Sequence, residues 1–245
     1  TSHHIGLHRL AGPLRQFTVR YPEVQLDIRF MDSEAACRAV EVGDLEMAIV
    51  TLPPDNPSRL QLDPIWDDPL AFMVAPDHAL ADRSVVSLDE LAALPAVLPG
   101  PTTYTRAILE QAVRARGVTL NVAMATNYLE TLHMLVATGL GWSLLPATVL
   151  DDKVREIKVD GMQLSRQLGA VTHHKPSLSN AGAEMIRLMQ NDQIEVIFFL
   201  LLHCFKAIPC SEHLESRLLQ INADGIQDVV FVINNKYFCI HNCLL

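Results

Sequence analysis

The apolar positions of the first fifty residues alternate between helical and strand spacing. Between residues 7 and 17 they recur every three or four positions, which predicts a helix that ends at Tyr21-Pro22. Between 24 and 30 they recur at every second position, which predicts a half-buried strand. Ser33 can then cap a helix over 34–42, and the mostly apolar segment 45–50 predicts a buried strand. Helix and strand in alternation, with short connections, are typical of a mostly parallel sheet.

The same alternation continues to residue 190. Ser87 and Glu90 have the spacing of a capping box at the start of a helix. Gly43, Gly117 and Gly139 each follow a predicted helix, where a residue with left-handed backbone ends it. The pattern predicts strands over 96–98, 120–125, 142–145 and 168–172, and helices over 103–116, 128–138 and 180–190.

Residue usage changes near Asn191. Residues 191–245 hold four of the five cysteines and are rich in Ile, Leu, Phe and Asn. In one interpretation, these residues take no part in ligand binding and are sequence that follows the natural end of the domain. The other is an added helix and hairpin, with Asn234-Asn235 as the turn between strands over 229–233 and 237–240. The two interpretations stay open at this point.

Charge and cysteine usage narrow the class of protein. The net charge of −9 and the lack of a Lys/Arg cluster argue against a free-standing nucleic-acid binder. The longest apolar run, 196–202, is shorter than the roughly 20 residues that a membrane span needs. Thr1-Ser2 opens no secretory signal, and five cysteines are too irregular for a disulfide framework. We therefore expect a cytoplasmic protein without a membrane contact.

Several short motifs occur in an order that is typical of one family. They are LAGPLRQFTVRYP at 10–22, EVGDLEMAI at 41–49, VAPDHALA at 74–81 and VATGLGWSLLP at 136–146. In this order and spacing they resemble the effector-binding domain of LysR-type transcriptional regulators, over about three-quarters of the chain. The last motif is the most specific, and Ala79 stands where the family usually has proline.

The resemblance implies a two-lobed α/β fold of the periplasmic-binding-protein type II, with mixed, mostly parallel sheets and an atypical C-terminal tail. Residues 1–190 would form this domain. Lobe I would comprise 1–74 and 169–190, lobe II 75–168, with crossings near Val74 and Leu168. Residues 191–245 would be the tail.

The resemblance also bears on assembly and on DNA. By the resemblance, we expect the family's helix-turn-helix domain, its linker helix and the first strand of lobe I to lie outside these residues, with Thr1-Ser2 at the point where that strand would meet the first helix. DNA would therefore be reached only through a domain outside these residues. Related domains pair antiparallel through elements that correspond to 10–20 and 128–138, which implies a homodimer or a tetramer.

Polar side chains collect at the predicted helix starts and at one strand end. In α/β sheets such turns meet at one edge, where helix N-termini present free N–H groups. We expect them to bind a small polar or anionic metabolite, although each can equally serve as a helix cap. Asp32 is unfavourable for an anion, and Arg106 could offset it or lie in solvent. The predicted effector-binding residues are Thr1, Ser2, Asp32, Ser33, Thr51, Thr102, Thr103, Thr126 and Asn127.

Other chemistry finds less support. The Gly-x-Ser-x-Gly motif of hydrolases is absent, so we predict no catalytic residues and no enzyme activity. The spacing around Cys239 and Cys243 matches no standard zinc site, and Gly139-Leu140-Gly141 precedes a strand where a nucleotide loop would precede a helix. We predict no metal and no cofactor. Adjacent histidines such as His3-His4 are interpreted as surface residues.

Two functions remain. One is the sensor half of a transcriptional regulator, and the other is a stand-alone solute-binding protein for transport, which shares the architecture. The missing signal peptide and the LysR-like motifs favour the sensor. The coding sequence upstream would separate them.

Overall fold

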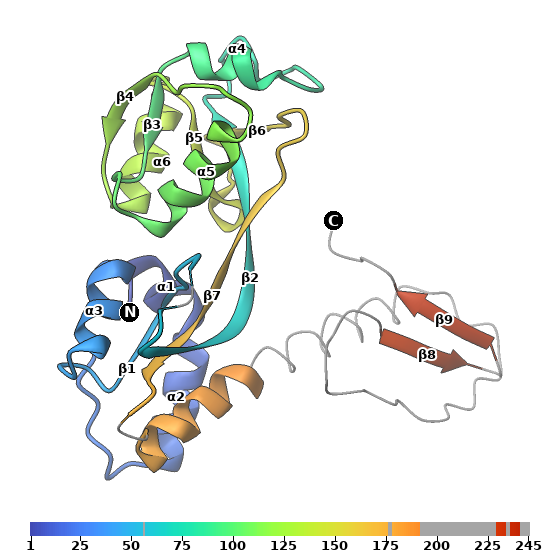
Figure 1. Cartoon of the computed structure of the whole chain (residues 1–245). Coiled ribbons are helices and arrows are strands. Elements are labelled where there is room, and N and C mark those ends of the chain that lie inside the picture. Colours follow the sequence, from blue (N-terminus) through green and yellow to red (C-terminus); the bar gives the residue numbers. More distant parts are fainter. Residues whose placement is uncertain (56, 176–177, 192–228, 234–235, 241–245) are drawn as a thin grey trace. The chain divides into compact units, whose positions relative to one another are not determined.

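The structure is a computed structural model that describes residues 1–55, 57–175, 178–191, 229–233 and 236–240 (Figure 1). The chain divides into two compact units, Thr1–Glu195 and Val196–Leu245. Each is described by itself. No helix among the described residues has the length and apolar character needed to cross a membrane.

The first lobe of the larger unit begins with three helices. The predicted helix over 7–17 is two helices, α1 (His3–Arg9) and α2 (Ala11–Arg20), and the Tyr21 N–H closes the second on the Phe17 carbonyl. Helix α3 (Ser33–Glu41) leads through Gly43, whose φ of 82° only glycine adopts readily, into strand β1 (Met47–Thr51). These predicted elements are confirmed with shifted ends.

The strand predicted over 24–30 is not assigned as a strand. Its four apolar side chains alternate as expected, but Val24, Leu26, Ile28 and Phe30 are 37–59% exposed. Alternation alone does not make a strand, because the backbone also needs a neighbouring strand for its ladder of hydrogen bonds. Among the described residues none lies beside this segment along its length.

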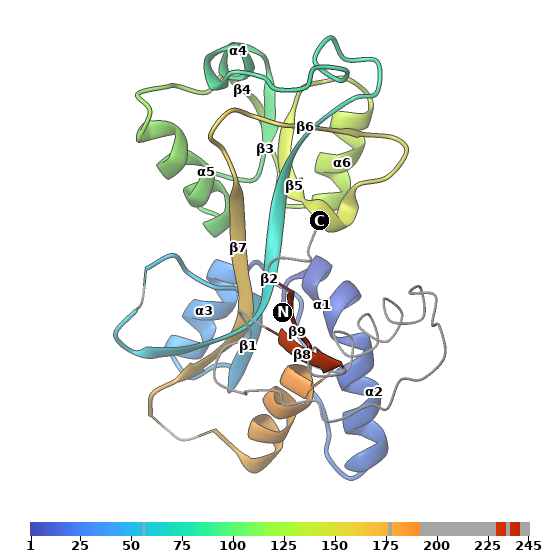
Figure 2. The ribbon, with the colours of Figure 1, turned by 90° about the vertical axis from the view of Figure 1, so that its right-hand side faces the viewer.

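Two long strands join the lobes. Strand β2 (Leu60–Val74) leaves the first lobe, and β7 (Leu164–His173) returns to it beside β2 (Figures 1 and 2). They pair antiparallel from Leu60↔His173 to Leu70↔Leu164, with a register shift between Pro64 and Trp66. Val74, expected at a crossing, instead lies fully buried in the core of the second lobe. The crossing of β2 therefore lies earlier in the strand.

The second lobe follows the predicted pattern closely. Helix α4 (Leu88–Ala93) is capped by Ser87, whose Oγ accepts from the Glu90 N–H at 3.2 Å. Beyond it come β3 (Ala96–Leu98), α5 (Tyr104–Arg114), β4 (Val122–Ala125), α6 (Leu129–Ala137), β5 (Ser143–Pro146), the 3-10 helix η1 (Ala147–Val149) and β6 (Arg155–Ile157). Residues 180–191 then form a helix of the first lobe.

The expectation of mostly parallel sheets is wrong for the described strands. In the five-stranded sheet, of order β1-β7-β2-β5 with β6 also on β2, every ladder is antiparallel. Of the ladders between named strands in residues 1–191, the β3–β4 pair alone is parallel. The reason is that β2 and β7 cross between the lobes in opposite directions, and both sides of the sheet are built on them.

The cores are separate for each lobe. Phe72, Leu98, Leu109 and Trp142 belong to a cluster of the second lobe. In the first lobe the sheet has a cluster on each face. Ile49, Phe17 and Met189 share one, whereas Ala48, Val50 and Val40 share the other. Alternate residues of β1 thus enter different clusters, as the geometry of a strand requires.

In the smaller unit, β8 (Val229–Ile233) and β9 (Lys236–Ile240) form an antiparallel pair with Ile233 opposite Lys236. The hairpin alternative placed its strands here. Its turn, Asn234-Asn235, and the apolar run 196–202 lie outside the described residues.

We expect a chain that ends at Gln190 to melt within about 2 °C of the full chain, because the larger unit has its own cores. Differential scanning calorimetry of both chains measures this. A clearly lower melting temperature, together with weaker ligand binding, would show that the tail is an integral part of the domain.

Candidate functional site

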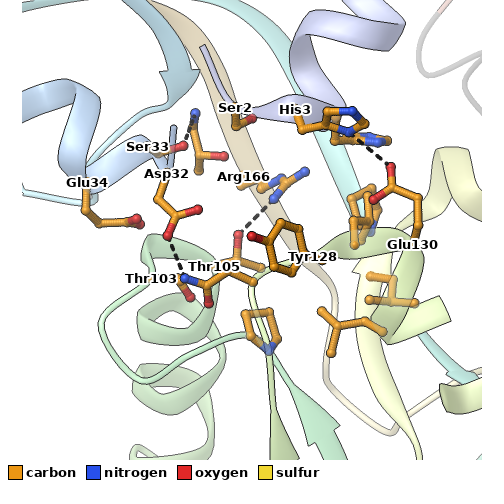
Figure 3. Close-up of a pocket in the computed structure, with 18 of the residues that line it drawn as sticks. Ser2, His3, Asp32, Ser33, Glu34, Thr103, Thr105, Tyr128, Glu130 and Arg166 are labelled. Atoms are coloured by element: carbon orange, nitrogen blue, oxygen red, sulfur yellow. Dashed lines mark hydrogen bonds and ion pairs between the residues drawn. The ribbon is translucent and has the colours of Figure 1, made fainter. Parts of the chain in front are cut away.

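A cavity of about 400 Å³ lies between the two lobes (Figure 3). The first lobe contributes the start of α1 and of α3, and the second contributes the start of α5, the loop before α6 and the end of β5. Six predicted residues line it: Ser2, Asp32, Ser33, Thr51, Thr103 and Asn127.

The other three predicted residues do not line this cavity. Thr1 lines a second cavity inside the first lobe. Thr102 is exposed outside the lining, and the Thr126 hydroxyl accepts from the Tyr128 N–H at 3.4 Å. Arg106 is 7% exposed and is held by Glu110 and the Pro99 carbonyl, so it does not offset Asp32. Sequence spacing could not distinguish a turn that faces the cavity from one just beside it.

Ser33 and Thr51 line the cavity on the side of the first lobe, and a hydrogen bond joins them. Ser33 is the first residue of α3, and its Oγ accepts from the Thr51 backbone N–H at 3.1 Å. Both residues are buried, at 7% and 4% exposure. The predicted cap at Ser33 is therefore wrong in detail, because its hydroxyl joins the helix to the end of β1, and Asp32 occupies the N-cap position.

Hydrogen bonds join the two lobes across the cavity. Asn127 accepts from the Gly100 N–H at 3.0 Å, and its Nδ2 donates to Asp32 of the first lobe at 2.7 Å. The Tyr104 N–H at the start of α5 donates to the Glu34 carboxylate at 2.6 Å. Burial raises the pKa of the Tyr104 hydroxyl, which also contacts Cys37 of α3. The Glu34 carboxylate of the first lobe thus already accepts a hydrogen bond from the first N–H of α5.

Sequence reasoning missed the cation of the cavity, Arg166. It lies on β7 opposite Asp68 of β2, and its Nε donates to the Asp68 carboxylate at 2.7 Å. Its Nη1 donates to Thr105 of α5 at 2.9 Å, so it contacts the second lobe directly (Figure 3). Asp68 is 1% exposed. No sequence signal marks this pair, because the partners are 98 positions apart.

Two histidines interpreted as surface residues also line the cavity. His3 Nδ1 lies 3.5 Å from the Glu130 carboxylate, across the lobes. Burial, with the nearby Arg166 next in importance, lowers the pKa of His4 to about 4. His4 is therefore neutral at physiological pH and adds no positive charge. Its Nδ1 is buried without a partner among the described residues.

The charge of the lining is negative. Asp32, Glu34 and Glu130 contribute three carboxylates, and Arg166, the one Lys or Arg of the lining, is already paired with Asp68. Among the described residues no three His, Cys, Asp or Glu side chains are grouped to hold a metal ion. The arrangement offers hydroxyl, amide and carboxylate groups to a small polar molecule.

Comparison with known proteins identifies the class of domain. Residues 1–193 match the family model described as LysR substrate binding domain, and the chain belongs to this family. Its fold is therefore of the periplasmic-binding-protein type II kind, with α/β content, as the motifs predicted.

Particular proteins are similar to this chain over about three-quarters of its length. The chain is 23% identical over 197 residues to the "Probable RuBisCO transcriptional regulator" of Cyanidioschyzon merolae, covering 76% of this chain and 65% of that protein. It is 27% identical over 191 residues to the "Phosphonates import ATP-binding protein PhnC" of Anaeromyxobacter dehalogenans, covering 75% and 38%. A solved structure, the effector-binding domain of QuiR in complex with shikimate, has a TM-score of 0.70 at 14% identity, covering 79% and 94%. The chain thus spans less than two thirds of the length of the RuBisCO regulator and of the PhnC protein.

Proposed function

We propose that this chain is the effector-sensing part of a LysR-type transcriptional regulator of the bacterial cytoplasm. A small polar metabolite binds between the lobes and changes how they are held. The change passes to a DNA-binding domain outside these residues. The observation that carries the proposal is the cavity of about 400 Å³ lined by polar groups of both lobes. Binding needs no cofactor and no catalytic step.

The charge of the lining favours one of the two predicted ligand classes. Three carboxylates face a single guanidinium that Asp68 already neutralises, so a bound anion would meet net repulsion. An uncharged, hydroxyl-rich molecule can bind the same groups without that cost. The effector-binding domain of QuiR, which shares the fold, was solved in complex with shikimate, a carboxylate at neutral pH, so shikimate is the anionic probe to compare with uncharged polyols.

We expect Asn127→Leu to weaken, by roughly fivefold, the binding of a ligand that hydrogen-bonds its amide, because a lost hydrogen bond typically costs about 1 kcal/mol. Thr102→Val is the matched control, since the exposed Thr102 lies outside the lining. Thermal-shift screening of uncharged polar metabolites, with shikimate as the anionic comparison, finds the ligand, and calorimetry measures both variants. Equal affinity in the two variants would remove Asn127 from the site.

Transport is the second candidate function. One relative carries the name of a phosphonate import protein, but this chain spans only 38% of it. The family match and the regulator relatives favour sensing. A coding sequence for a helix-turn-helix directly upstream would support regulation, whereas a signal peptide there would support transport.

We also propose self-association through α2 and α6. Val19 of α2 is 78% exposed, and Tyr128 and Met134 beside and within α6 are 71% and 49% exposed. Large exposed apolar side chains on these two helices are the observation that supports an interface there. We expect the chain to sediment as a dimer or larger at tens of micromolar, and Val19→Glu to shift it toward monomer. Val85→Glu, at an exposed site elsewhere, should leave the sedimentation unchanged. A strictly monomeric wild-type chain would contradict the proposal.

A further inference from the structure

The start of α5 presents hydrogen-bond donors to the cavity between the lobes. It is the N-terminus of an eleven-residue helix, and Thr103 and Thr105 line the cavity there. The first N–H groups of a helix have no partner within it, and the helix dipole adds positive charge at this end. The Thr103 hydroxyl accepts from the Arg106 N–H at 3.2 Å. The N–H groups of Tyr104 and Thr105 are the donors that remain for an anion.

A carboxylate of the protein itself occupies this helix end. Glu34, the second residue of α3 in the first lobe, extends toward the start of α5 (Figure 3). Its Oε1 accepts from the Tyr104 N–H at 2.6 Å. An anion is therefore bound where the dipole of α5 favours one, and it comes from the opposite lobe.

The side chain of Tyr104 holds the two helices in this position. Its hydroxyl forms a hydrogen bond with Cys37, three positions after Glu34 on α3. Its ring packs against the first-lobe cluster that contains Val40 and Val50, although Tyr104 belongs to α5 of the second lobe. The contact between Glu34 and α5 is thus supported by packing as well as by charge.

Glu34 differs in this respect from the other two carboxylates of the lining. Asp32 accepts from the side-chain amide of Asn127, and Glu130 lies beside His3. Neither accepts from a backbone N–H at a helix start among the described residues. An anion from solution that approached α5 would find the Tyr104 N–H taken, and it would also be repelled by the charge of Glu34 at close range.

We propose that Glu34 determines the charge specificity of the cavity, because it occupies the anion-binding end of α5 and thereby excludes anionic ligands. The inference rests on the proposed function, since it assigns a residue to the preference for uncharged polar ligands. Two effects contribute to the exclusion. One is the N–H that Glu34 already uses, and the other is its negative charge.

The test is a gain of anion binding, with sulfate as the probe. Sulfate is titrated at constant ionic strength against the wild-type chain, Glu34→Ala and Glu34→Gln, and the amide resonances of Tyr104 and Thr105 are followed by NMR. We expect Glu34→Ala to bind sulfate at least about tenfold more tightly than the wild type, because it frees the N–H and removes the charge. Glu34→Gln keeps an acceptor for the Tyr104 N–H, so its gain should be smaller, about threefold.

Glu130→Ala is the matched control. It removes one carboxylate from the same lining but leaves Glu34 on α5. The Glu130 side chain is 57% exposed, and salt screens an exposed charge, so sulfate affinity should stay within about twofold of the wild type. An equal gain in Glu130→Ala and Glu34→Ala would overturn the proposal, because the total charge of the lining would then be the cause.

Two further results would overturn it. One is a wild-type chain in which sulfate shifts the Tyr104 and Thr105 resonances as strongly as in Glu34→Ala. The other is no gain in either Glu34 variant. Circular dichroism checks that the variants are folded, and Glu34→Gln decides the outcome if Glu34→Ala is not.

Failure of the proposed function would look different. If no uncharged polar metabolite stabilises the wild-type chain, the sensing proposal fails, but the sulfate titration still reports on Glu34. If such a metabolite binds and neither variant gains sulfate affinity, the role of Glu34 alone is overturned.

Discussion

Asp68→Ala is expected to lower the free energy of unfolding by about 3–5 kcal/mol, because it leaves the guanidinium of Arg166 without its buried partner. Asp68 is 1% exposed, and the side chain of Arg166 is 11% exposed. Their pairing joins β2 to β7 where the strands pass between the lobes. Urea denaturation followed by circular dichroism measures the loss.

Two variants define what that loss means. Asp67→Ala, one position earlier on the same strand, removes an exposed carboxylate and should cost far less. The double variant Asp68→Leu with Arg166→Met should be more stable than Asp68→Ala alone, because no unpaired charge stays buried. If the double variant is no more stable than Asp68→Ala, loss of packing and not loss of charge pairing is the cause.

The second large effect is expected at Trp142. Its side chain is fully buried, its Nε1 donates to the Leu94 carbonyl at 3.3 Å, and its ring lies 5.9 Å from that of Phe72. Trp142→Ala should cost about 3–5 kcal/mol through the cavity that it leaves. For a domain of this size that is a fall in melting temperature of about 6–20 °C.

Leu140 is the natural control for Trp142. It lies two positions earlier, in the Gly-Leu-Gly segment that directly precedes Trp142, but is 46% exposed. Leu140→Ala should change stability by no more than about 0.5 kcal/mol, as is usual for surface positions. Calorimetry that finds the two variants within a degree of each other would show that the indole is not part of the core.

The elements that could be predicted are those with a local cause. Gly43, Gly117 and Gly139 mark helix ends, and all three have positive φ in the structure. The Ser87 cap is present, and β3 has the predicted bounds. Each of these signals depends on residues close together in the sequence.

The elements that could not be predicted depend on distant partners. Strand β2 contains Pro64, Pro69 and the carboxylates of Asp67 and Asp68, so no strand period is visible in it. Burying the charge of Asp68 in this strand is favourable only because Arg166 of β7 pairs with it. Conversely, residues 24–30 have the alternating apolar pattern of a strand but are not assigned as one. An alternating sequence does not by itself provide the neighbouring strand that a ladder of hydrogen bonds needs.

The candidate site shows the same division. Helix starts could be located, so six of the nine predicted residues lie in the lining. Which turn faces the cleft depends on how the helices are rotated, and this excludes Thr102 and Thr126. Glu34 and Arg166 could be found only in three dimensions, because each acts on a residue of the other lobe.

The hydrogen bonds between the lobes affect the effector concentration at which the domain would change its conformation. Asp32 and Glu34 already hold Asn127 and Tyr104 of the opposite lobe, so a ligand that uses these carboxylates competes with the protein's own groups. Its apparent affinity is its intrinsic affinity reduced by the cost of breaking those contacts. For a ligand that bonds these carboxylates but not Asn127, weakening the contacts would lower the effector concentration at half response, but it would also reduce the difference between the two states that the ligand can report. For such a ligand, the same two carboxylates would set both sensitivity and signal range, and the two would change in opposite directions.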